Sequence, residues 1–277
     1  MATMIGQNLI NGSMVNTMQT LIGSGDIKDI YYGYFNFSDH NDFSGRAQGN
    51  GIAGKLGLTY KVNDELTVGA TYHSKTDIGD LTGSSSVTVA ISGGPAFGNT
   101  DVVQELQGHI SVRDFQWPAI YGAGLAWQAR PDLMIAADIK RILWADVMEN
   151  FRMSFTANNT PSYGPFANKT MNATLPQNWD DQTVIQLGIA YQLDDKTVLR
   201  AGFNGADNPI PDSTVNYLFP AIVENHYTFG IGRSLSNSSE INFAMSYAPE
   251  VKVTDANNGI TITHEQSSWQ LMYSHLY

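Results

Sequence analysis

Cysteine is absent from the 277-residue sequence. A disulfide framework, a thiolate metal site and a cysteine nucleophile are therefore excluded. Charged residues are also scarce, at 15% of the chain, where an average soluble domain has about a quarter. The balance is acidic, with a formal net charge of −11, so the chain lacks the basic patches that bind phosphate backbones. Nucleic acid is not an expected partner.

Long hydrophobic runs are missing as well. No stretch reaches the roughly 18 apolar residues that a transmembrane helix needs, and the mean hydropathy is only −0.20, which excludes a bundle of such helices. Aromatic residues, in contrast, make up 11% of the chain, and there are 26 glycines. Low charge, mild hydropathy and many aromatic residues are typical of a transmembrane β-barrel. They fit a large soluble β-sandwich less well.

The start of the sequence shows no secretory signal pattern. Residues 1–20 contain no basic segment followed by an apolar core and a cleavage site. For an outer-membrane protein, this predicts that the sequence is a mature chain or a fragment.

Residues 4–23 have helical spacing instead. Apolar side chains recur at i, i+4, i+7 and i+8, namely Met14, Met18, Leu21 and Ile22, and Gly23 follows them. One interpretation is a surface helix that packs on a β domain. The other is an apolar binding groove, because methionine side chains adapt to varied ligands.

Strict alternation of two kinds of side chain is clearest in residues 181–206. Apolar residues take every second position, at Ile185, Leu187, Ile189, Tyr191 and Leu193, and again at Leu199, Ala201 and Phe203. Small or polar residues fill the positions between them, and the polar turn 194–196 separates the two runs. The pattern predicts an antiparallel hairpin with two different faces. In a soluble sheet the apolar face meets a core, whereas in an outer-membrane barrel it meets lipid.

The same alternation predicts nine long strands, at 51–62, 66–75, 119–129, 133–144, 183–193, 197–206, 225–235, 239–249 and 265–277. Short links (63–65, 130–132, 194–196 and 236–238) alternate with long ones (76–117, 147–180, 208–224 and 250–264). Short periplasmic turns and long extracellular loops are typical of an up-and-down transmembrane barrel. We therefore predict an all-β fold, an antiparallel up-and-down transmembrane β-barrel. Residues 1–50 are predicted to form an extracellular loop segment with an amphipathic helix, and residues 51–277 the barrel strands and loops.

Three finer features complete this prediction. Residues 29–37 are aromatic and strand-like, and within the first long link Ser85–Ile91 could pair with Gln107–Val112 as a hairpin. Nine is an odd number, whereas bacterial single-chain barrels have an even number of strands. We therefore expect that the N-terminal part of a larger barrel is missing.

Several motifs in residues 179–248 resemble the long-chain fatty acid transporter (FadL/TodX) family of outer-membrane proteins. They are Leu187-Gly188-x-x-Tyr191, Leu199-Arg200-x-Gly202, Asp207-Asn208-Pro209-Ile210-Pro211, Phe219-Pro220 and His226-x-x-Phe229-Gly230-x-Gly232, with weaker matches at Lys55-x-Gly57-x-x-Tyr60 and Trp117-Pro118. The resemblance is to the C-terminal two-thirds of the family. It implies the last nine strands of a fourteen-stranded barrel, with residues 1–28 in a large extracellular loop that forms a first ligand groove. It also implies passive movement of hydrophobic molecules into the membrane.

Few charged side chains point to the inner face by alternation: Lys55, His73, Asp138, Lys140 and Arg200. One hypothesis is that Lys140 or Arg200 meets a substrate carboxylate inside the barrel. The alternative is that these cations pair with Asp138 or other acidic neighbours, as buried charges usually do. Arg141 points outward by the same alternation, which is costly on a lipid face unless it lies near the interface. A bulge there could instead reset the register.

A second candidate site lies on the predicted extracellular segments. Its members are the apolar residues Met14, Met18, Leu21 and Ile22 together with Leu218, Phe219 and Ile222 of a later loop. Exposed apolar patches of this kind suggest ligand capture. The alternative is that the loops pack on one another.

An enzyme is not expected. Acyl transfer needs a serine and a histidine held in register, and the six histidines stand near no G-x-S-x-G or other local signature. No metal-ligand spacing and no cofactor motif is found. We expect an outer-membrane channel for passive uptake of hydrophobic compounds such as long-chain fatty acids or aromatic hydrocarbons, in contact with outer-membrane lipid and lipopolysaccharide. A general polar porin and a soluble β-sheet binding protein are the alternatives.

Overall fold

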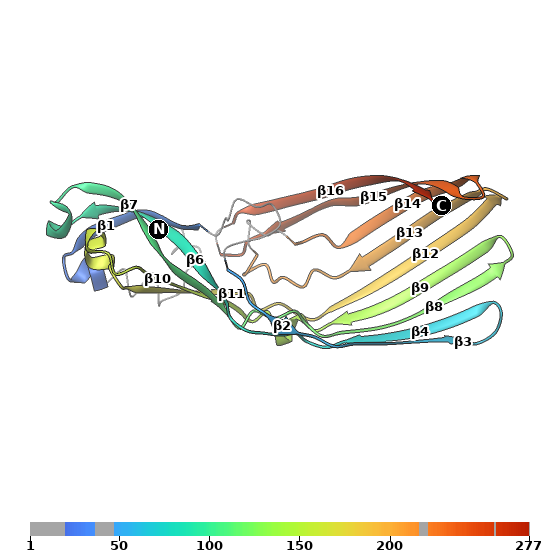
Figure 1. Ribbon diagram of the computed structural model, residues 1–277, viewed down its shortest axis with the longest axis horizontal. Coiled ribbons are helices and arrows are strands. Elements are labelled where there is room, and N and C mark those ends of the chain that lie inside the picture. The colour runs from blue at the N-terminus through green and yellow to red at the C-terminus, as the bar shows by residue number, and fades with distance from the viewer. Residues whose placement is uncertain (1–19, 37–46, 216–220, 258, 277) are drawn as a thin grey trace. The chain divides into compact units, whose positions relative to one another are not determined.

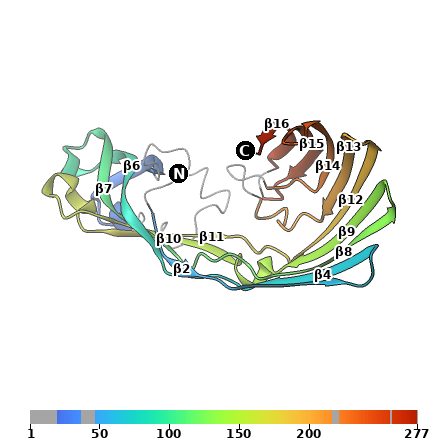
Figure 2. The ribbon, with the colours of Figure 1, turned by 45° about the vertical axis from the view of Figure 1, so that its right-hand side comes forward.

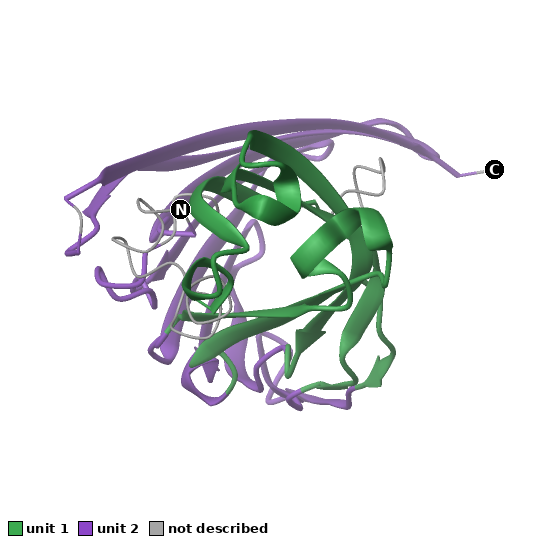
Figure 3. Ribbon diagram, turned by 90° about the vertical axis from the view of Figure 1, so that its left-hand side faces the viewer, with its two compact units in different colours: residues 1–52, 76–116, 147–177 green, residues 53–75, 117–146, 178–277 purple. Residues whose placement is uncertain are grey.

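A computed structural model describes residues 20–36, 47–215, 221–257 and 259–276 (Figure 1). The chain is predominantly β, as predicted, and it divides into two compact units (Figure 3). Unit 1 comprises residues 1–52, 76–116 and 147–177, and unit 2 comprises residues 53–75, 117–146 and 178–277. In the described part of the chain, no helix is long and apolar enough to cross a membrane.

Unit 2 is built on one antiparallel sheet (Figures 1 and 2). Within the described residues its nine strands are β3 (Lys55–Lys61), β4 (Leu66–His73), β8 (Ile120–Arg130), β9 (Leu133–Ile142), β12 (Gln182–Asp194), β13 (Thr197–Ala206), β14 (Asn225–Ser236), β15 (Ser239–Thr254) and β16 (Thr261–His275). Their spatial order is β16-β15-β14-β13-β12-β9-β8-β4-β3, so each strand lies beside its nearest neighbour in the chain within this sheet. Each of the nine predicted ranges overlaps one of these strands. The up-and-down order follows from the period-2 pattern and the short polar turns.

The short turns are closed by the polar residues that stand in them. Between β3 and β4, Asn63 Oδ1 accepts hydrogen bonds from the backbone N–H groups of Glu65 at 2.9 Å and Leu66 at 2.7 Å. Between β12 and β13, the backbone N–H of Lys196 donates to Asp194 Oδ1 at 2.8 Å. Asparagine and aspartate favour such turns because their side chains bond the backbone two or three residues on. These bonds hold consecutive strands in register.

Unit 1 contains a second antiparallel sheet of five strands among the described residues, in the order β1-β6-β7-β10-β11. The strands are β1 (Ile27–Asn36), β6 (Leu81–Gly93), β7 (Asp101–Arg113), β10 (Asn150–Ala157) and β11 (Thr170–Pro176). The short strands β2 (Gly51–Ile52) and β5 (Asp77–Ile78) pair with each other. Where unit 1 is described, it also contains the 3-10 helices η1 (Pro95–Phe97) and η3 (Pro161–Phe166), while η2 (Trp144–Asp146) belongs to unit 2.

The hairpin expected within the first long link is confirmed, because β6 pairs with β7 and Ser86 lies opposite Gln107. Residues 29–36 of the stretch expected to be strand-like form most of β1, which pairs with β6. The hairpin β10–β11 was not predicted. Its signal was present, since Phe151, Met153, Phe155 and Ala157 alternate with polar residues, but the many Asn, Thr and Pro residues of 147–180 favoured a loop.

Unit 1 has a buried hydrophobic core. Phe155, Leu106 and Ile110 are fully buried, and Leu21 is 5% exposed in the same cluster. The core forms because one face of each strand carries apolar side chains at period 2. The compact units do not follow the predicted division into residues 1–50 and 51–277, because two of the long links fold together with β1. The extracellular position of residues 1–50 remains a prediction.

Candidate functional site

The nine-stranded sheet of unit 2 has one face of large, exposed apolar side chains. Trp269 is 74% exposed, Leu58 70% and Phe229 51%. Cross-strand pairing joins such residues into continuous rows, one of which runs Leu66, Trp127, Ile135, Ile189, Ala201, Phe229, Met245 and Trp269. Large exposed apolar surfaces mark a membrane or partner interface. We call this the apolar face.

The opposite face, here the inner face, carries small residues. One row perpendicular to the strands consists of Thr67, Ala126, Ala136, Gly188, Gly202, Thr228, Ser246 and Ser268, each paired with the next. No member of this row is charged or larger than threonine. We call it the small-residue belt.

The inward charges predicted from the sequence flank this belt, and glycines lie beside them. Asp138 is the cross-strand partner of Gly124, and a β-carbon on Gly124 would overlap its carboxylate. Lys140 pairs with Gly122, where an added β-carbon would stand 3.5 Å from Lys140 Cγ. These glycines provide the room in which the charged side chains lie along the wall.

Arg200 lies on the other side of the belt, near the short turns. It pairs with Gly230. Its Nη1 atom stands 2.8 Å from the place of a β-carbon on Gly232, which also adjoins the side chain of Asn242. In the part of the chain that the structure describes, neither Lys140 nor Arg200 forms an ion pair. The predicted alternative, pairing with Asp138, is therefore not seen there. Both cations remain available to an anionic group.

Arg141 lies on the apolar face, and the alternative of a bulge that resets the register is wrong. The register of β9 with β8 and β12 continues through Arg141 and Ile142 without a shift. Arg141 instead sits near the end of the strand that leads into a long link. It donates to Thr183 Oγ1 at 2.9 Å and forms an ion pair with Asp181 at 3.3 Å. The ion pair with Asp181, at the rim of the sheet, offsets the desolvation cost of placing a cation on an apolar face.

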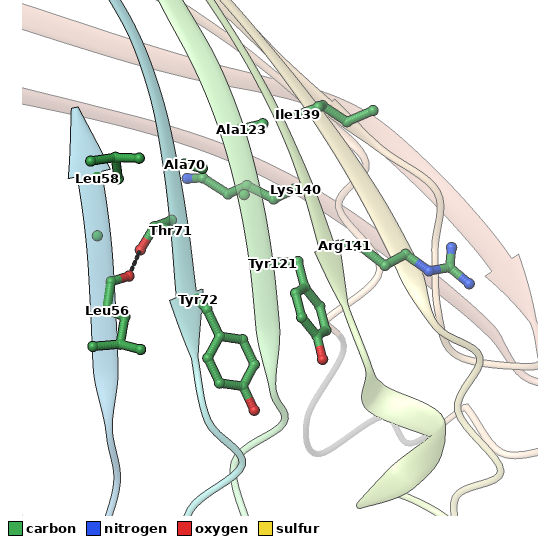
Figure 4. A pocket seen from close by; sticks show the side chains of 12 residues that line it. Leu56, Leu58, Ala70, Thr71, Tyr72, Tyr121, Ala123, Ile139, Lys140 and Arg141 are labelled. Atoms are coloured by element: carbon green, nitrogen blue, oxygen red, sulfur yellow. Dashed lines mark hydrogen bonds between the residues drawn. The ribbon is translucent and has the colours of Figure 1, made fainter. Parts of the chain in front are cut away.

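A hollow of about 600 Å³ lies beside Arg141 (Figure 4). Most of its lining lies on the apolar face, namely Leu56, Leu58, Ala70, Tyr72, Tyr121, Ala123, Ile139 and Arg141, and the inner-face positions Gly57, Thr71, Gly122 and Lys140 complete it. A second hollow of about 430 Å³ is lined largely by inner-face residues of β3, β4, β8 and β9, including Gly57, Gly69, Gly124 and Asp138. The sequence did not predict either hollow, because each depends on which residues of neighbouring strands lie side by side.

The second predicted site is only partly described. Met14, Met18, Leu218 and Phe219 lie outside the described residues. Leu21 is buried in the core of unit 1, and Ile22 is 39% exposed. Ile222 is fully buried in unit 2, in a cluster with Ile210 and Val215. For Leu21 and Ile222 the side chains pack within their own units, and ligand binding by this set remains a proposal.

A tryptophan cluster in unit 2 was missed at the sequence level. The rings of Trp117 and Trp144 are 6.3 Å apart, and those of Trp144 and Trp179 are 5.1 Å apart in an edge-on arrangement. Trp179 also packs against the cluster around Ile222. The available signal was that Trp117 and Trp179 stand in long links shortly before predicted strands, and that Trp144 is the last residue of the predicted strand 133–144, before another long link. The cluster ties the rims of β8, β9 and β12 to the later loops.

Among the described residues, no group of three or more His, Asp or Glu side chains is arranged to hold a metal ion. The expectations that the chain is not an enzyme and needs no cofactor remain predictions.

Solved structures of outer-membrane channels are similar to this chain. The P. putida toluene transporter TodX shares 28% identity with a TM-score of 0.73, and the match covers 100% of this chain and 60% of that one. The CymD monoaromatic hydrocarbon channel shares 25% identity with a TM-score of 0.69, covering 100% and 63%. The Ralstonia pickettii toluene transporter TbuX shares 26% identity with a TM-score of 0.66, covering 99% and 57%. The chain thus spans about 60% of the length of the TodX structure.

Sequence comparison gives the same assignment. No curated protein matches the chain closely enough to count as a relative. The family described as outer membrane protein transport protein (OMPP1/FadL/TodX) matches residues 10–274, which is nearly the whole chain. The resemblance inferred from the motifs is therefore confirmed. The chain belongs to the outer membrane protein transport protein (OMPP1/FadL/TodX) family, whose place is the bacterial outer membrane.

Proposed function

We propose that this protein is a passive outer-membrane channel for hydrophobic compounds, with monoaromatic hydrocarbons as its first substrate class. The small-residue belt carries the proposal, because it lines the inner face across eight strands without charge or bulk. The names of similar proteins support the substrate class, since they include toluene transporters and monoaromatic hydrocarbon channels. A general polar porin would need a more charged lumen, and a soluble binding protein would not expose the apolar face to water.

The nine strands are proposed to be the last nine of fourteen. Among the described residues, no strand pairs with the outer edge of β3 or β16. Because the strands alternate in direction, the first and ninth run the same way, and only an odd number of further strands closes the sheet with antiparallel seams. Five such strands would give the fourteen that the family resemblance implies. Closure would satisfy the edge N–H and C=O groups, which lipid cannot do.

The proposed orientation puts the short turns in the periplasm and the long links outside the cell. Two of the long links contain β5, β6, β7, β10 and β11 of unit 1. We propose that the N-terminal segment captures the substrate there through Met14, Met18 and Ile22 together with Phe219, while Leu21 anchors this segment in the core of unit 1. The substrate then leaves water for the lumen and moves toward the bilayer. The gain from removing apolar surface from water drives entry. No covalent step and no energy source is needed.

A matched pair of substitutions tests the belt. Ala136 and Ala137 are neighbours on β9, and alternation places Ala136 in the belt and Ala137 on the apolar face. In outer-membrane vesicles from cells that make the protein, we expect Ala136→Trp to abolish most uptake of radiolabelled toluene. Ala137→Trp is expected to leave uptake unchanged. Equal uptake by both variants would exclude the belt as the path, and rapid uptake of glucose by the wild type would favour the polar porin.

Long-chain fatty acids are the second candidate class, favoured by the cations Arg200 and Lys140. Neither cation forms an ion pair within the described residues, and guanidinium groups bind carboxylates in a two-point fork. If carboxylates pass, Arg200→Gln should slow uptake of a fatty acid while toluene uptake stays constant. Equal slowing of both compounds would indicate a general change in the lumen instead.

A further inference from the structure

The hollow beside Arg141 is lined mainly by apolar-face residues of β3, β4, β8 and β9, and the inner-face positions Gly57, Thr71, Gly122 and Lys140 also line it. Its centre is the cross-strand row Leu58, Ala70, Ala123 and Ile139, in which two alanines stand between larger side chains. The rows on either side are bulkier: Tyr72 and Tyr121 on one, Val68 and Leu125 on the other. The depression of about 600 Å³ therefore results from the two alanines.

Backbone hydrogen bonding separates the outward-facing part of this hollow, over Ala70 and Ala123, from the inner face. The registers of β3 with β4 and of β4 with β8 contain no bulge, and the shift between β8 and β9 lies at Gln128–Arg130, away from Ala123. A molecule in the hollow would therefore come from the membrane side rather than from the lumen. Since the hollow is continuous with the apolar rows that meet lipid, an acyl chain is the occupant that matches its lining.

The rim of the hollow is polar and basic. The rings of Tyr72 and Tyr121 lie 4.9 Å apart, and both hydroxyls point away from the alanines (Figure 4). Arg141 is the cross-strand partner of Tyr121. Tyrosine and arginine side chains are typical of the level at which lipid headgroups begin. The hollow thus has an apolar floor and a headgroup-level rim.

Asp181 holds the Arg141 guanidinium in place. One carboxylate oxygen pairs with Arg141 at 3.3 Å, and the other accepts the backbone N–H of Ala145 at 3.2 Å. Thr183 accepts a further hydrogen bond from Arg141. A guanidinium has five N–H donors, and the Arg141 side chain is 49% exposed. Donors therefore remain for an anionic oxygen from the membrane side.

We propose that this hollow binds a phosphorylated glycolipid of the outer leaflet, with one acyl chain over Ala70 and Ala123 and a phosphate on Arg141. The chemistry that supports this occupant is an apolar slot joined to a cation at headgroup level. The inference rests on the proposed orientation, which places this rim outside the cell. Asp181 is then a positioning residue, because it acts through Arg141.

The test measures binding of fluorescent lipid A to the full chain in phosphatidylcholine vesicles. Arg141→Gln removes the cation, and Ala123→Phe fills the slot. Ala201→Phe is the matched control, because Ala201 lies on the same apolar face between Ile189 and Phe229. We expect Arg141→Gln and Ala123→Phe each to weaken binding about tenfold, which corresponds to about 1.4 kcal/mol. Ala201→Phe should bind as the wild type does, and Arg141→Lys should restore part of the affinity.

Dephosphorylated lipid A separates the two halves of the site. Dephosphorylated lipid A should bind the wild type as weakly as lipid A binds Arg141→Gln. Removing the phosphates and Arg141 together should weaken binding no more than removing either one alone, because both changes remove the same contact. Equal losses in Ala123→Phe and Ala201→Phe, or no loss in Arg141→Gln, would overturn the proposal. Toluene uptake by outer-membrane vesicles that contain the same variants is measured in parallel. If the wild type binds lipid A but takes up no toluene, the transport proposal alone is contradicted. If it takes up toluene but does not bind lipid A, only the lipid-binding inference is contradicted.

Discussion

Both sheets of this protein alternate apolar with small or polar side chains, but the apolar face is buried in unit 1 and exposed in unit 2. In unit 1, the apolar side chains of β6, β7 and β10 face a core in which Leu106, Ile110 and Phe155 are fully buried. In unit 2, the corresponding face leaves Leu58 and Trp269 at least 70% exposed. A face that is apolar in both units is therefore covered by protein in one and must be covered by lipid in the other. The comparison shows that alternation assigns residues to a face but does not say what covers it.

The difference is sharpest for two phenylalanines. Phe155 is fully buried in unit 1, whereas Phe229 is 51% exposed on the apolar face of unit 2. We expect Phe155→Ala to destabilise unit 1 by about 3–5 kcal/mol, because it leaves a cavity in a packed core. Phe229→Ala should have a much smaller effect, since lipid can fill the space. Urea unfolding in lipid vesicles, followed by limited proteolysis of each unit, measures both. Equal losses would mean that the apolar face also packs against protein.

The next largest effect on the free energy of unfolding is expected from a charge introduced on the apolar face of unit 2. Ala137→Arg places a cation in the middle of the apolar face, and we expect a loss of about 2–4 kcal/mol if that face meets the bilayer interior. Ala136→Arg, one residue away on the inner face, should cost little because the lumen is hydrated. Folding yields and unfolding free energies in vesicles give the comparison. The same cost for both substitutions would refute the assignment of lipid and lumen faces.

Glycine substitutions compare the space available in the two sheets. A β-carbon on Gly108 in unit 1 would overlap the Thr156 carbonyl oxygen and the Phe155 ring, whereas on Gly188 in unit 2 the nearest atom would be Ala136 Cβ at 3.9 Å. Gly108→Ala is expected to cost about 1–3 kcal/mol through overpacking. Gly188→Ala should be tolerated. Thermal unfolding of the two variants measures the difference, and a destabilising Gly188→Ala would contradict an open inner face.

The smallest effect concerns a turn of unit 2. Asn63 accepts two backbone hydrogen bonds that close the β3–β4 link. Asn63→Ala is expected to lower the free energy of unfolding by about 0.5–1.5 kcal/mol in total, because water replaces the lost acceptor at this exposed site. Asn237→Ala, in the link between β14 and β15, serves as the control in the same unfolding experiment. A loss above that of Gly108→Ala would show that this turn does more than set the register.

Much of unit 2 could be predicted because its signals are local. Period-2 alternation identified each of the nine strands, and the polar turns indicated which strands are consecutive in the sheet. Unit 1 was only partly foreseen. The pair β6–β7 was expected, but β10–β11 was not, because its short apolar alternation around Phe155 lies among Asn, Thr and Pro residues. Short strands depend more on the sheet they join than on their own sequence.

The candidate sites divide in the same way. Alternation placed Lys140, Arg200 and Asp138 on the inner face and Arg141 on the outer one. It did not foresee that Asp181 pairs with Arg141, nor that Gly124 and Gly232 make room for Asp138 and Arg200. These contacts join residues from different strands, and no spacing along one strand encodes them. The tryptophan cluster escaped for the same reason.

The sequence by itself determined the fold class, the strands of unit 2, the two faces of each strand and the membership of an outer-membrane family. Each of these features follows from a pattern of residues within one continuous stretch of the chain. Only the tertiary structure decided the small-residue belt, the hollow between Ala70 and Ala123, and the burial of Leu21 and Ile222 in separate units. These depend on cross-strand register and on which segments pack together, and both are set by hydrogen bonds and contacts between residues far apart in the chain.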